Sequence, residues 1–369
     1  MKIIGLEPFI LHVPVTGSAI ADSTNAVTHW GAPGVIVHTD AGISGCGYTG
    51  TLGHLACDRL IRDCIGEVLG PLVLGQDALA TASLWEQMTA YPPLKWVGRA
   101  GIAQMAIAAV DVALWDIKAK AADMPLWQLL GGNEKKRLAA YNTDGGWLNW
   151  SKQQLIDDAR RAVDAGFWGV KIKIGKPDPH EDLDRIEAVR DAVGAEVNFM
   201  VDGNCAWDLP TAIHFGGRFA DYDLYWFEEP LAADDVSGHA ELARAIETPI
   251  AVGESLYRVS EFRRYMEARA IHHVQPDATR LGGITPWLPA AELAQSFGLP
   301  VIAHVADMMH IHAHLAFAHP ACRMLEYIPW MRVCFEEPVT VEDGCFVLPR
   351  NPGAGTTFCG DTIERFGVS

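Results

Sequence analysis

The pattern of hydrophobic and polar positions changes character after about residue 125. The earlier residues form strand-like runs, at 3–13 and 34–39, and then helical segments, of which Ile102–Ala121 is the longest and carries few helix breakers. The later residues alternate short β-rich runs with amphipathic helical segments, which is typical of parallel β/α units. The pattern therefore predicts an α+β domain over residues 1–125 and a β/α domain over residues 126–338.

Eight apolar runs in the later part are candidates for the strands of a barrel. They lie at 138–141, 170–174, 198–202, 225–228, 250–254, 273–277, 301–304 and 323–326. Consecutive runs lie about 20–30 residues apart, which leaves room for one helix between each pair. This number of units predicts a β/α barrel of the TIM type, in which catalytic residues stand at the carboxyl ends of the strands.

The final segment, residues 339–369, becomes β-like again, with turn signals at 342–344 and 351–353. We expect this segment to return to the N-terminal domain. No low-complexity linker separates the parts, so they should pack tightly against one another. The predicted fold class is therefore α/β: a modified TIM barrel with an α+β N-terminal capping domain that the C-terminal tail completes.

The composition narrows the classes of partner. The chain of 369 residues carries a formal net charge of −17, which argues against nucleic acid and against an anionic membrane surface. No run reaches the ~18 apolar residues of a membrane helix, and Glu7, Pro8 and His12 interrupt the region where a secretory signal would be apolar. The eight cysteines form no C-x-x-C pair, as expected for reduced thiols. We expect a cytoplasmic protein that binds a small molecule.

Three carboxylates stand at or near the ends of consecutive candidate strands at equal intervals. Asp202, Glu228 and Glu254 follow one another at steps of 26 residues, so we expect them at the same height in the barrel mouth. Converging carboxylates repel one another unless a cation joins them, and oxygen ligands favour Mg²⁺ or Mn²⁺. Glu229 also follows a strand, but side chains alternate, so we assign Glu228 as the inward one.

Basic groups occupy further strand ends. Lys171 and Lys173 alternate with apolar residues, which predicts that both lysines point into the barrel mouth. Burial beside another cation lowers the pKa of a lysine, so one of the two could act as a base near neutral pH. His304 ends the seventh run and Asp277 ends the sixth, where the carboxylate could orient the imidazole for acid–base work.

Other metal chemistry has less support in the sequence. His310 and His314 stand four residues apart and could imitate a zinc pair, but no H-E-x-x-H motif is present. A metal-dependent hydrolase barrel would normally place histidine ligands at its strand ends, where this chain has carboxylates.

The motifs around these residues resemble the mandelate racemase branch of the enolase superfamily over essentially the full length of the chain. They are Lys171-Ile172-Lys173, Val201-Asp202-Gly203-Asn204, Trp226-Phe227-Glu228-Glu229-Pro230, Gly253-Glu254-Ser255, Gln275-Pro276-Asp277, Leu281-Gly282-Gly283-Ile284-Thr285, Ala303-His304 and Leu325-Glu326. The resemblance implies an enzyme that removes the proton next to a carboxylate and passes through an enediolate.

The resemblance also implies roles for the site residues. Asp202, Glu228 and Glu254 would hold one Mg²⁺ per subunit, or Mn²⁺ in its place. Lys173 would be the acid–base group on one face of the substrate, and His304 the group on the other.

The resemblance implies further groups that assist the metal ligands and the two acid–base residues. Asp277 would pair with His304, and Lys171 would lie near the substrate carboxylate. Protonated Glu326 would donate a hydrogen bond to the enediolate oxygen. Two cap loops, at about 16–33 and 47–54, would set specificity.

Within that branch the similar stretches are those of sugar acid dehydratases, at 141–143, 173–177, 228–231 and 275–278. We therefore expect dehydration of an aldarate or aldonate to a 2-keto-3-deoxy acid, which makes the protein a hydro-lyase of carbohydrate catabolism. Acid–base groups on both faces also permit racemisation or epimerisation of a hydroxy or amino acid, and cycloisomerisation of a sugar acid lactone. Members of the family commonly form homo-oligomers, from dimers to octamers.

Polar side chains near the barrel mouth are candidates for holding the substrate hydroxyls. They are Asn142, Thr143 and Asn204 from the barrel, and His29 and Tyr48 from the cap.

Overall fold

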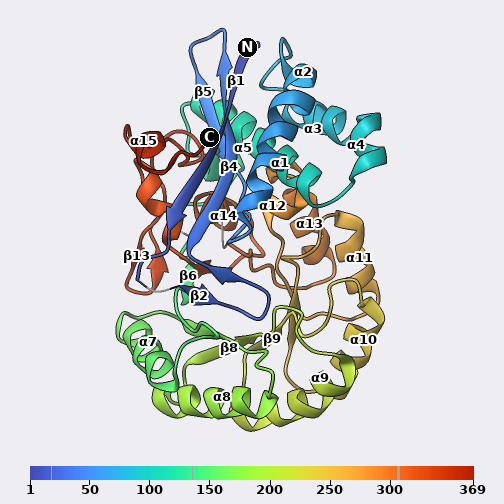
Figure 1. Cartoon of the computed structure of the whole chain (residues 1–369), viewed down its shortest axis with the longest axis vertical. Helices are drawn as coiled ribbons and strands as arrows, with labels where there is room; N and C mark the ends of the chain where they lie inside the picture. The colour runs from blue at the N-terminus through green and yellow to red at the C-terminus, as the bar shows by residue number, and fades with distance from the viewer. Residues whose placement is uncertain (18, 135, 306–307) are drawn as a thin grey trace.

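The computed structural model describes residues 1–17, 19–134, 136–305 and 308–369. A cap formed by the N-terminal residues lies over a β/α barrel, with the cap at the top of Figure 1 and the barrel below it. No helix in these four ranges is both long and apolar enough to cross a membrane. All eight cysteines are unpaired.

The cap is built on an antiparallel sheet. β4 (His29–Thr39) lies between β1 (Ile3–Pro14) and β5 (Ser44–Tyr48), and α5 (Ile102–Ala121) packs on this sheet. The contact between α5 and β5 is close, because a Cβ atom on Gly47 would lie 2.0 Å from the Ala109 carbonyl oxygen. The other cap elements are β2 (Ile20–Ala21), β3 (Ala26–Val27), a 3₁₀ turn (Leu55–Cys57), α1 (Asp58–Asp63), a π-helical segment (Cys64–Leu69), α2 (Gly70–Val73), α3 (Thr81–Ala90) and α4 (Pro92–Val97).

The barrel strands run parallel in chain order, and the barrel closes where the last strand pairs with the first. The strands are β6 (Ala139–Asn142), β7 (Gly169–Lys173), β8 (Asn198–Asp202), β9 (Trp226–Glu228), β10 (Ile250–Val252), β11 (His273–Val274) and β12 (Met324–Tyr327). The predicted strand at 301–304 is reduced to Val301, which forms single parallel bridges to Val274 and Cys322. The predicted barrel with a cap is therefore present, with one strand shortened to a bridge.

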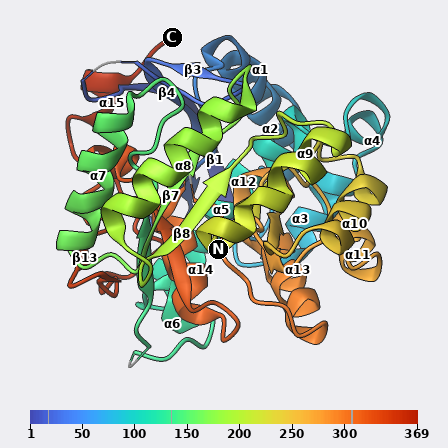
Figure 2. The same cartoon turned by 90° about the horizontal axis from the view of Figure 1, so that it is seen from below.

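Helices surround the strands on the outside (Figures 1 and 2). They are α6 (Leu126–Leu129), α7 (Lys152–Asp164), α8 (Pro179–Val193), α9 (Leu209–Gly216), a 3₁₀ segment (Gly217–Tyr222), α10 (Val236–Ala245), α11 (Val259–Glu267), α12 (Ala278–Leu281), α13 (Ile284–Ser296), α14 (Met309–Ala318) and a 3₁₀ segment (Trp330–Cys334). Local sequence explains several of the starts. Ser151 and Gln154 form a capping box at α7, and Asp178, Asp208 and Asp235 cap the next three helices.

Two apolar layers sandwich the barrel strands. Outward residues such as Val170 and Ile172 join the large core beneath the helices. Inward residues form a separate cluster that fills the barrel interior: Tyr141, Met200, Trp226, Ala251, Ile302 and Met324. Because side chains alternate along a strand, the next inward positions after Met200, Trp226 and Met324 carry the charged residues Asp202, Glu228 and Glu326.

The C-terminal segment divides between barrel and cap. β14 (Cys345–Phe346) pairs with β13 (Val341–Glu342) and with β6, so the first part of the segment extends the barrel sheet. Later residues contact the cap. The Ala354 N–H donates a hydrogen bond to Asp116, the Thr356 hydroxyl donates one to the Cys46 carbonyl oxygen, and Gly367, after α15 (Thr362–Phe366), forms a bridge with Leu11. The segment therefore contacts both the barrel and the cap.

Candidate active site

The parallel register of β7, β8 and β9 brings charged residues side by side. Lys173 pairs in register with Asp202, and Asp202 with Glu228. Nζ of Lys173 lies 2.5 Å from an Asp202 carboxylate oxygen. Lys171, whose side chain is 1% exposed, lies 2.7 Å from Glu228 and 2.9 Å from Glu326. Both lysines therefore point into the barrel mouth, as the alternation predicts.

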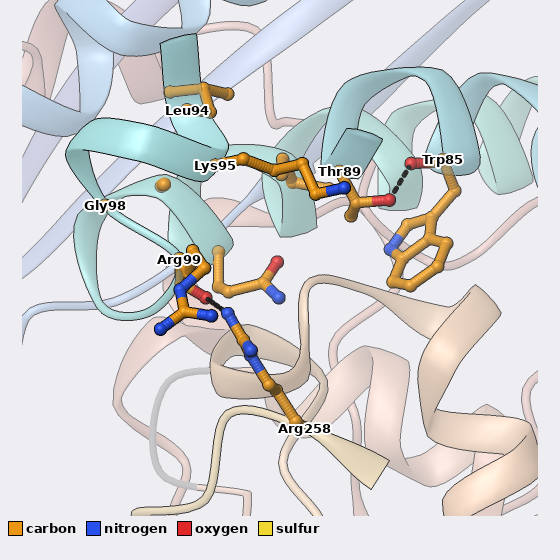
Figure 3. Close-up of a pocket in the computed structure, with 10 residues that line it drawn as sticks. Trp85, Thr89, Leu94, Lys95, Gly98, Arg99 and Arg258 are labelled. Carbon is orange, nitrogen blue, oxygen red and sulfur yellow. Dashed lines mark hydrogen bonds between the residues drawn. The ribbon is translucent and has the colours of Figure 1, made fainter. Parts of the chain in front are cut away.

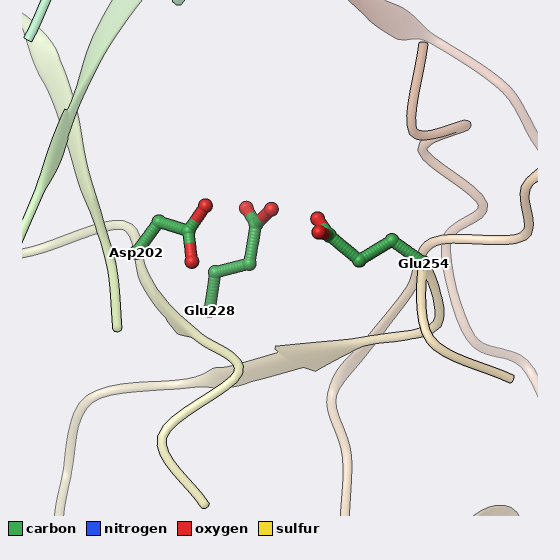
Figure 4. A group of neighbouring side chains, drawn as sticks. All are labelled: Asp202, Glu228 and Glu254. Carbon is green, nitrogen blue, oxygen red and sulfur yellow. The ribbon is translucent and has the colours of Figure 1, made fainter. Parts of the chain in front are cut away.

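The three evenly spaced carboxylates meet. Asp202, Glu228 and Glu254 each offer one oxygen, and these atoms all lie within 4.8 Å of one another. Figure 4 shows the three carboxylates pointing toward a common centre. Burial raises the pKa of Glu228 to about 8; Lys171 opposes this shift, and the other two carboxylates add to it.

Three oxygen ligands of this kind fit a hard divalent cation such as Mg²⁺. Charge supports the same conclusion, because a dication would offset the repulsion that makes the ionised form of Glu228 costly. Among the residues that the structure describes, this triad is the one group of three or more histidine, cysteine or acidic side chains whose ligand atoms lie close enough together to hold a metal ion. His310 and His314 lie buried within α14 and are not part of such a group.

His304 stands across the triad from Lys173. Its Nδ1 lies 2.7 Å from Asp277, and its Nε2 lies 3.3 Å from Glu254. Burial lowers the pKa of His304, but Glu254 and Asp277 outweigh burial and raise it to about 10. Asp277 in turn has its pKa held well below the usual range by the His304 hydrogen bond, despite its burial. The pair is arranged to keep the imidazole protonated and fixed in orientation.

The surroundings of Glu326 oppose the protonated form that we expected. Its carboxylate accepts hydrogen bonds from the Thr143 hydroxyl at 2.9 Å and the Val305 backbone N–H at 3.0 Å, and it lies beside Lys171. Burial raises the pKa of Glu326, but Lys171 and His304 outweigh burial and bring it to about 2. The hydrogen-bond donors and the two cations around Glu326 therefore favour its ionised form.

The expected lowering of a lysine pKa is also not found. Burial lowers the pKa of both lysines, but Asp202 outweighs burial at Lys173, and Glu228 and Glu326 outweigh it at Lys171. Each lysine therefore has a raised pKa. At Lys173 the neighbouring Lys171 does lower the pKa, but the Asp202 carboxylate on the next strand has the larger effect.

A cavity of about 440 Å³ opens above the triad, between barrel and cap. Lys173, Asn204, Glu254, His304 and Glu326 line it on the barrel side. Both predicted cap loops contribute to its lining: Asp22, Thr24, Asn25, Val27 and Trp30 from the first, and Gly50, Thr51, Leu52 and His54 from the second. Ser18, in the first loop, lies outside the described residues.

The first cap loop is tied down at the barrel mouth. The Ser23 hydroxyl lies 3.1 Å from the Gly203 carbonyl oxygen and 3.2 Å from that of Asn204. Asp22 accepts hydrogen bonds from the backbone N–H groups of Thr24 and Asn25, which fixes the turn between β2 and β3. The loop is thus held over the cavity.

Several predicted substrate contacts lie elsewhere. Among the residues that line the cavity, His29, Tyr48, Asn142 and Lys171 do not occur. His29 is exposed beside Thr28, and Tyr48 is fully buried and stacked on Phe335.

Local contacts explain why Asn142 and Lys171 do not line the cavity. Asn142 hydrogen-bonds Asp158 on α7, and Lys171 lies deeper in the barrel than the cavity, among carboxylates. Alternation places the neighbouring residue in the cavity in two cases, Trp30 in place of His29 and Thr143 in place of Asn142.

Sequence reasoning missed part of the cavity wall. Trp30 and Trp147 both lie against Trp330, with ring centroids 3.9 and 5.2 Å from it. The first turn of α5 contributes Ile102 and Met105. The tryptophans offered no sequence signal beyond their size, because aromatic residues usually serve the core.

Comparison with known proteins gives consistent matches. Residues 9–131 match the mandelate racemase/muconate lactonizing enzyme N-terminal domain, and residues 154–362 match a domain family described as enolase C-terminal domain-like.

Individual relatives are sugar acid enzymes. An L-talarate/galactarate dehydratase from Salmonella typhimurium LT2 is 41% identical over 271 residues, covering 72% of this chain and 67% of the relative. An arabinonate dehydratase from Saccharolobus solfataricus is 34% identical over 87% of each chain. A 3,6-anhydro-α-L-galactonate cycloisomerase from Streptomyces coelicolor is 32% identical over 90% of this chain and 91% of the relative.

The likeness extends to three dimensions. The Salmonella dehydratase, liganded with Mg and L-lyxarohydroxamate, superposes with a TM-score of 0.92 at 33% identity, covering 100% of this chain and 93% of that one.

Proposed function

This chain belongs to the mandelate racemase/muconate lactonizing enzyme family of the enolase superfamily, and we propose that it dehydrates a sugar acid to a 2-keto-3-deoxy acid with the help of Mg²⁺. One observation carries the proposal. Lys173 and His304 line one cavity and contact opposite ends of the carboxylate triad, Asp202 and Glu254 respectively. Two proton-transfer groups thus flank the place where a substrate carboxylate would meet the cation.

Asp202, Glu228 and Glu254 are the residues that would hold Mg²⁺, which supplies positive charge next to the carboxylate whose α-proton is removed. Lys171 adds a buried positive charge beside the same carboxylates. A local excess of positive charge of this kind would also draw an anionic substrate to a protein of net charge −17.

The two acid–base groups divide the proton transfers. Against burial, Asp202 raises the pKa of Lys173, and a cation held by Asp202 would offset that carboxylate's charge and so favour the neutral amine. Neutral Lys173 takes the proton from C2 to leave an enediolate, whose electron pair forms the C2–C3 double bond as the C3–O bond breaks. His304 donates a proton to the leaving hydroxyl, which departs as water. The raised pKa of His304, about 10, keeps it protonated at neutral pH for this role. The enol product then takes up a proton at C3 and loses the proton of its C2 hydroxyl, which gives the 2-keto acid.

The cavity lining suits a hydroxylated substrate. Asn204 and Thr143 offer hydrogen-bonding groups on the barrel side, and Asn25 and Thr51 offer them on the cap side. These residues are our candidates for holding the substrate hydroxyls.

The direct test is a panel of aldonic and aldaric acids with Mg²⁺, in which semicarbazide traps any 2-keto product. We expect at least one acid to yield a keto acid, and the yield to disappear when the metal is chelated. If every acid sugar remains unchanged while a hydroxy or amino acid changes configuration in deuterated water, the enzyme is a racemase and dehydration is wrong.

Cycloisomerisation is the second candidate. The Streptomyces cycloisomerase aligns with 90% of this chain, a larger share than the 72% aligned with the Salmonella dehydratase. An anhydro sugar acid and a sugar acid lactone belong in the same panel. Conversion of one of these to a semicarbazide-reactive keto acid of unchanged mass, in the absence of turnover of any aldonic or aldaric acid, would favour this candidate.

A further inference from the structure

A second cavity lies on the cap side of the molecule, away from the triad, and cations are the only charged residues that line it. It has a volume of about 280 Å³ and is enclosed by α3, α4, the N-terminal half of α5 and the residue before α11 (Figure 3). Lys95, Arg99 and Arg258 line it, and no described acidic residue does.

The three cations have no anionic partner among the described residues. Lys95 and Arg99 are exposed, and the half-buried Arg258 donates a hydrogen bond to the Arg99 carbonyl oxygen at 2.8 Å. This bond holds Arg258 close to the segment that bears Arg99, as Figure 3 shows. Gathering like charges costs coulombic free energy that an anion would offset, and in a protein of net charge −17 such a cavity is a local attractor for small anions.

The uncharged residues that line the cavity indicate a second feature of its ligand, a hydroxyl group. Gln104 is 8% exposed, and its Oε1 has no hydrogen-bond partner. A buried acceptor without a partner is costly, and a hydroxyl group on a ligand would satisfy it. Trp85, held by its indole N–H bond to the Gly282 carbonyl oxygen at 2.9 Å, offers an apolar surface for the carbon atoms of such a ligand.

The cavity shares a wall with the candidate active site. In the first turns of α5, Ile102 and Met105 line the active-site cavity, and Gln104 and Ile107 line the cationic one. Tyr257 and Arg258 divide in the same way between the two cavities. An occupant of the cationic cavity would therefore contact the elements that bound the substrate.

We propose that the cationic cavity binds a small hydroxylated oxyanion, and that its occupancy steadies the shared wall and thereby lowers the KM for the substrate. The carboxylate of a sugar acid and the phosphate of a phosphorylated sugar share the required chemistry, namely an anionic group for the three cations and a hydroxyl for Gln104. Ordering the wall in advance removes a cost that substrate binding would otherwise bear. The binding itself does not depend on the dehydratase assignment.

Calorimetric titration of the full Mg²⁺-loaded chain tests the binding. D-gluconate is the carboxylate probe, provided that the substrate panel shows that it is neither turned over nor a competitive inhibitor; glucose 6-phosphate is the phosphate ester probe, and inorganic phosphate is the probe without a carbon skeleton. We expect saturable binding of at least one hydroxylated probe, weaker binding of inorganic phosphate, and at least a tenfold loss of affinity in a Lys95→Gln/Arg99→Gln variant. Arg59→Gln is the matched control, because Arg59 is an exposed cap cation that does not line the cavity, and it should bind like the wild type.

Kinetics test the second half of the proposal. The bound probe should lower the KM of the wild type and of Arg59→Gln with little change in kcat, and it should leave the double variant unaffected. Binding without a change in KM would overturn the effector role. Equal binding by the wild type and the double variant would overturn the site.

A rival explanation is an interface between copies, since Trp96 on α4 is 92% exposed beside these cations. If no probe binds the wild type while the double variant changes the sedimenting mass, the cations serve that interface and the proposal is wrong.

Discussion

Glu228 is the most deeply enclosed of the three proposed cation ligands. It is fully buried, it pairs in register with Asp202, and its carboxylate lies close to those of Asp202 and Glu254. Glu228→Gln should weaken Mg²⁺ binding by more than the roughly 10–100-fold typical of losing an outer partner of a metal ligand. Calorimetric titration with Mg²⁺ measures this, and activity should fall with it. Glu229→Gln is the neighbouring control and should still bind Mg²⁺; equal loss in both variants would mean that the wrong glutamate is assigned.

The His304–Asp277 pair gives a graded prediction. His304→Asn removes a proton-transfer group and should lower kcat by about 10²–10⁴-fold. Asp277→Asn leaves the imidazole in place but removes the carboxylate 2.7 Å from its Nδ1, so we expect a smaller loss of about 10–100-fold. Steady-state kinetics with a substrate from the panel test this order. The reverse order would show that Asp277, rather than His304, acts on the substrate.

Among the elements, the contact between α5 and β5 tolerates the least change. A Cβ atom on Gly47 would lie 2.0 Å from the Ala109 carbonyl oxygen, so Gly47→Ala must push the helix off the sheet. We expect a loss of about 1–3 kcal/mol in the free energy of unfolding, measured by urea denaturation. Gly217→Ala is the control, because a Cβ atom there meets nothing within 4 Å and its φ of −61° suits any residue. The contact is looser than the structure indicates if the two variants unfold alike.

For the molecule as a whole, buried neutral histidines predict a loss of stability in acid. Burial lowers the pKa of His310 and of His314 to about 3 and that of His312 to about 4. His312 and His314 also accept hydrogen bonds from the backbone N–H groups of Ala278 and Trp127, which protonation would break. α14 is thus joined to its neighbours by groups that must stay neutral.

The direction of this pH dependence follows from how many protons the folded and unfolded chains bind. Between about pH 3 and pH 6.5 the unfolded chain binds more protons at these residues than the folded chain does, so their contribution is complete above pH 6.5 and is lost as the pH falls. Each histidine contributes a slope of about 1.4 kcal/mol per pH unit in that window. His310→Gln removes one such group, so its free energy of unfolding should fall less steeply with acid than that of the wild type. Parallel slopes in urea denaturation from pH 7 to 4.5 would contradict this.

The sequence alone placed the barrel and the ligand triad because both rest on periodic patterns. A parallel strand advances one unit at a time, so the 26-residue step from Asp202 to Glu228 translates into paired positions at one height. The second step does not, because Glu228 pairs with Ala251, and Glu254 reaches the other two carboxylates from three residues further along, beyond the end of β10. Alternation likewise put Lys171 and Lys173 on the inner face. Regular structure repeats the same backbone geometry, so sequence spacing there converts directly into distance.

For residues outside those patterns, long-range packing decides which side chain lines the cavity and how each pKa is shifted. Trp30 rather than His29 lines the cavity, because the docking of the cap on the barrel decides which face of β4 meets the cavity. Burial raises the pKa of Glu326, but Lys171 from one strand and His304 from another lower it further, and a pKa depends on every neighbour in space. The cationic cavity also depends on long-range packing. Lys95 and Arg99 belong to one segment and Arg258 lies more than 150 residues further along the chain, so only the docking of the cap on the barrel brings them together.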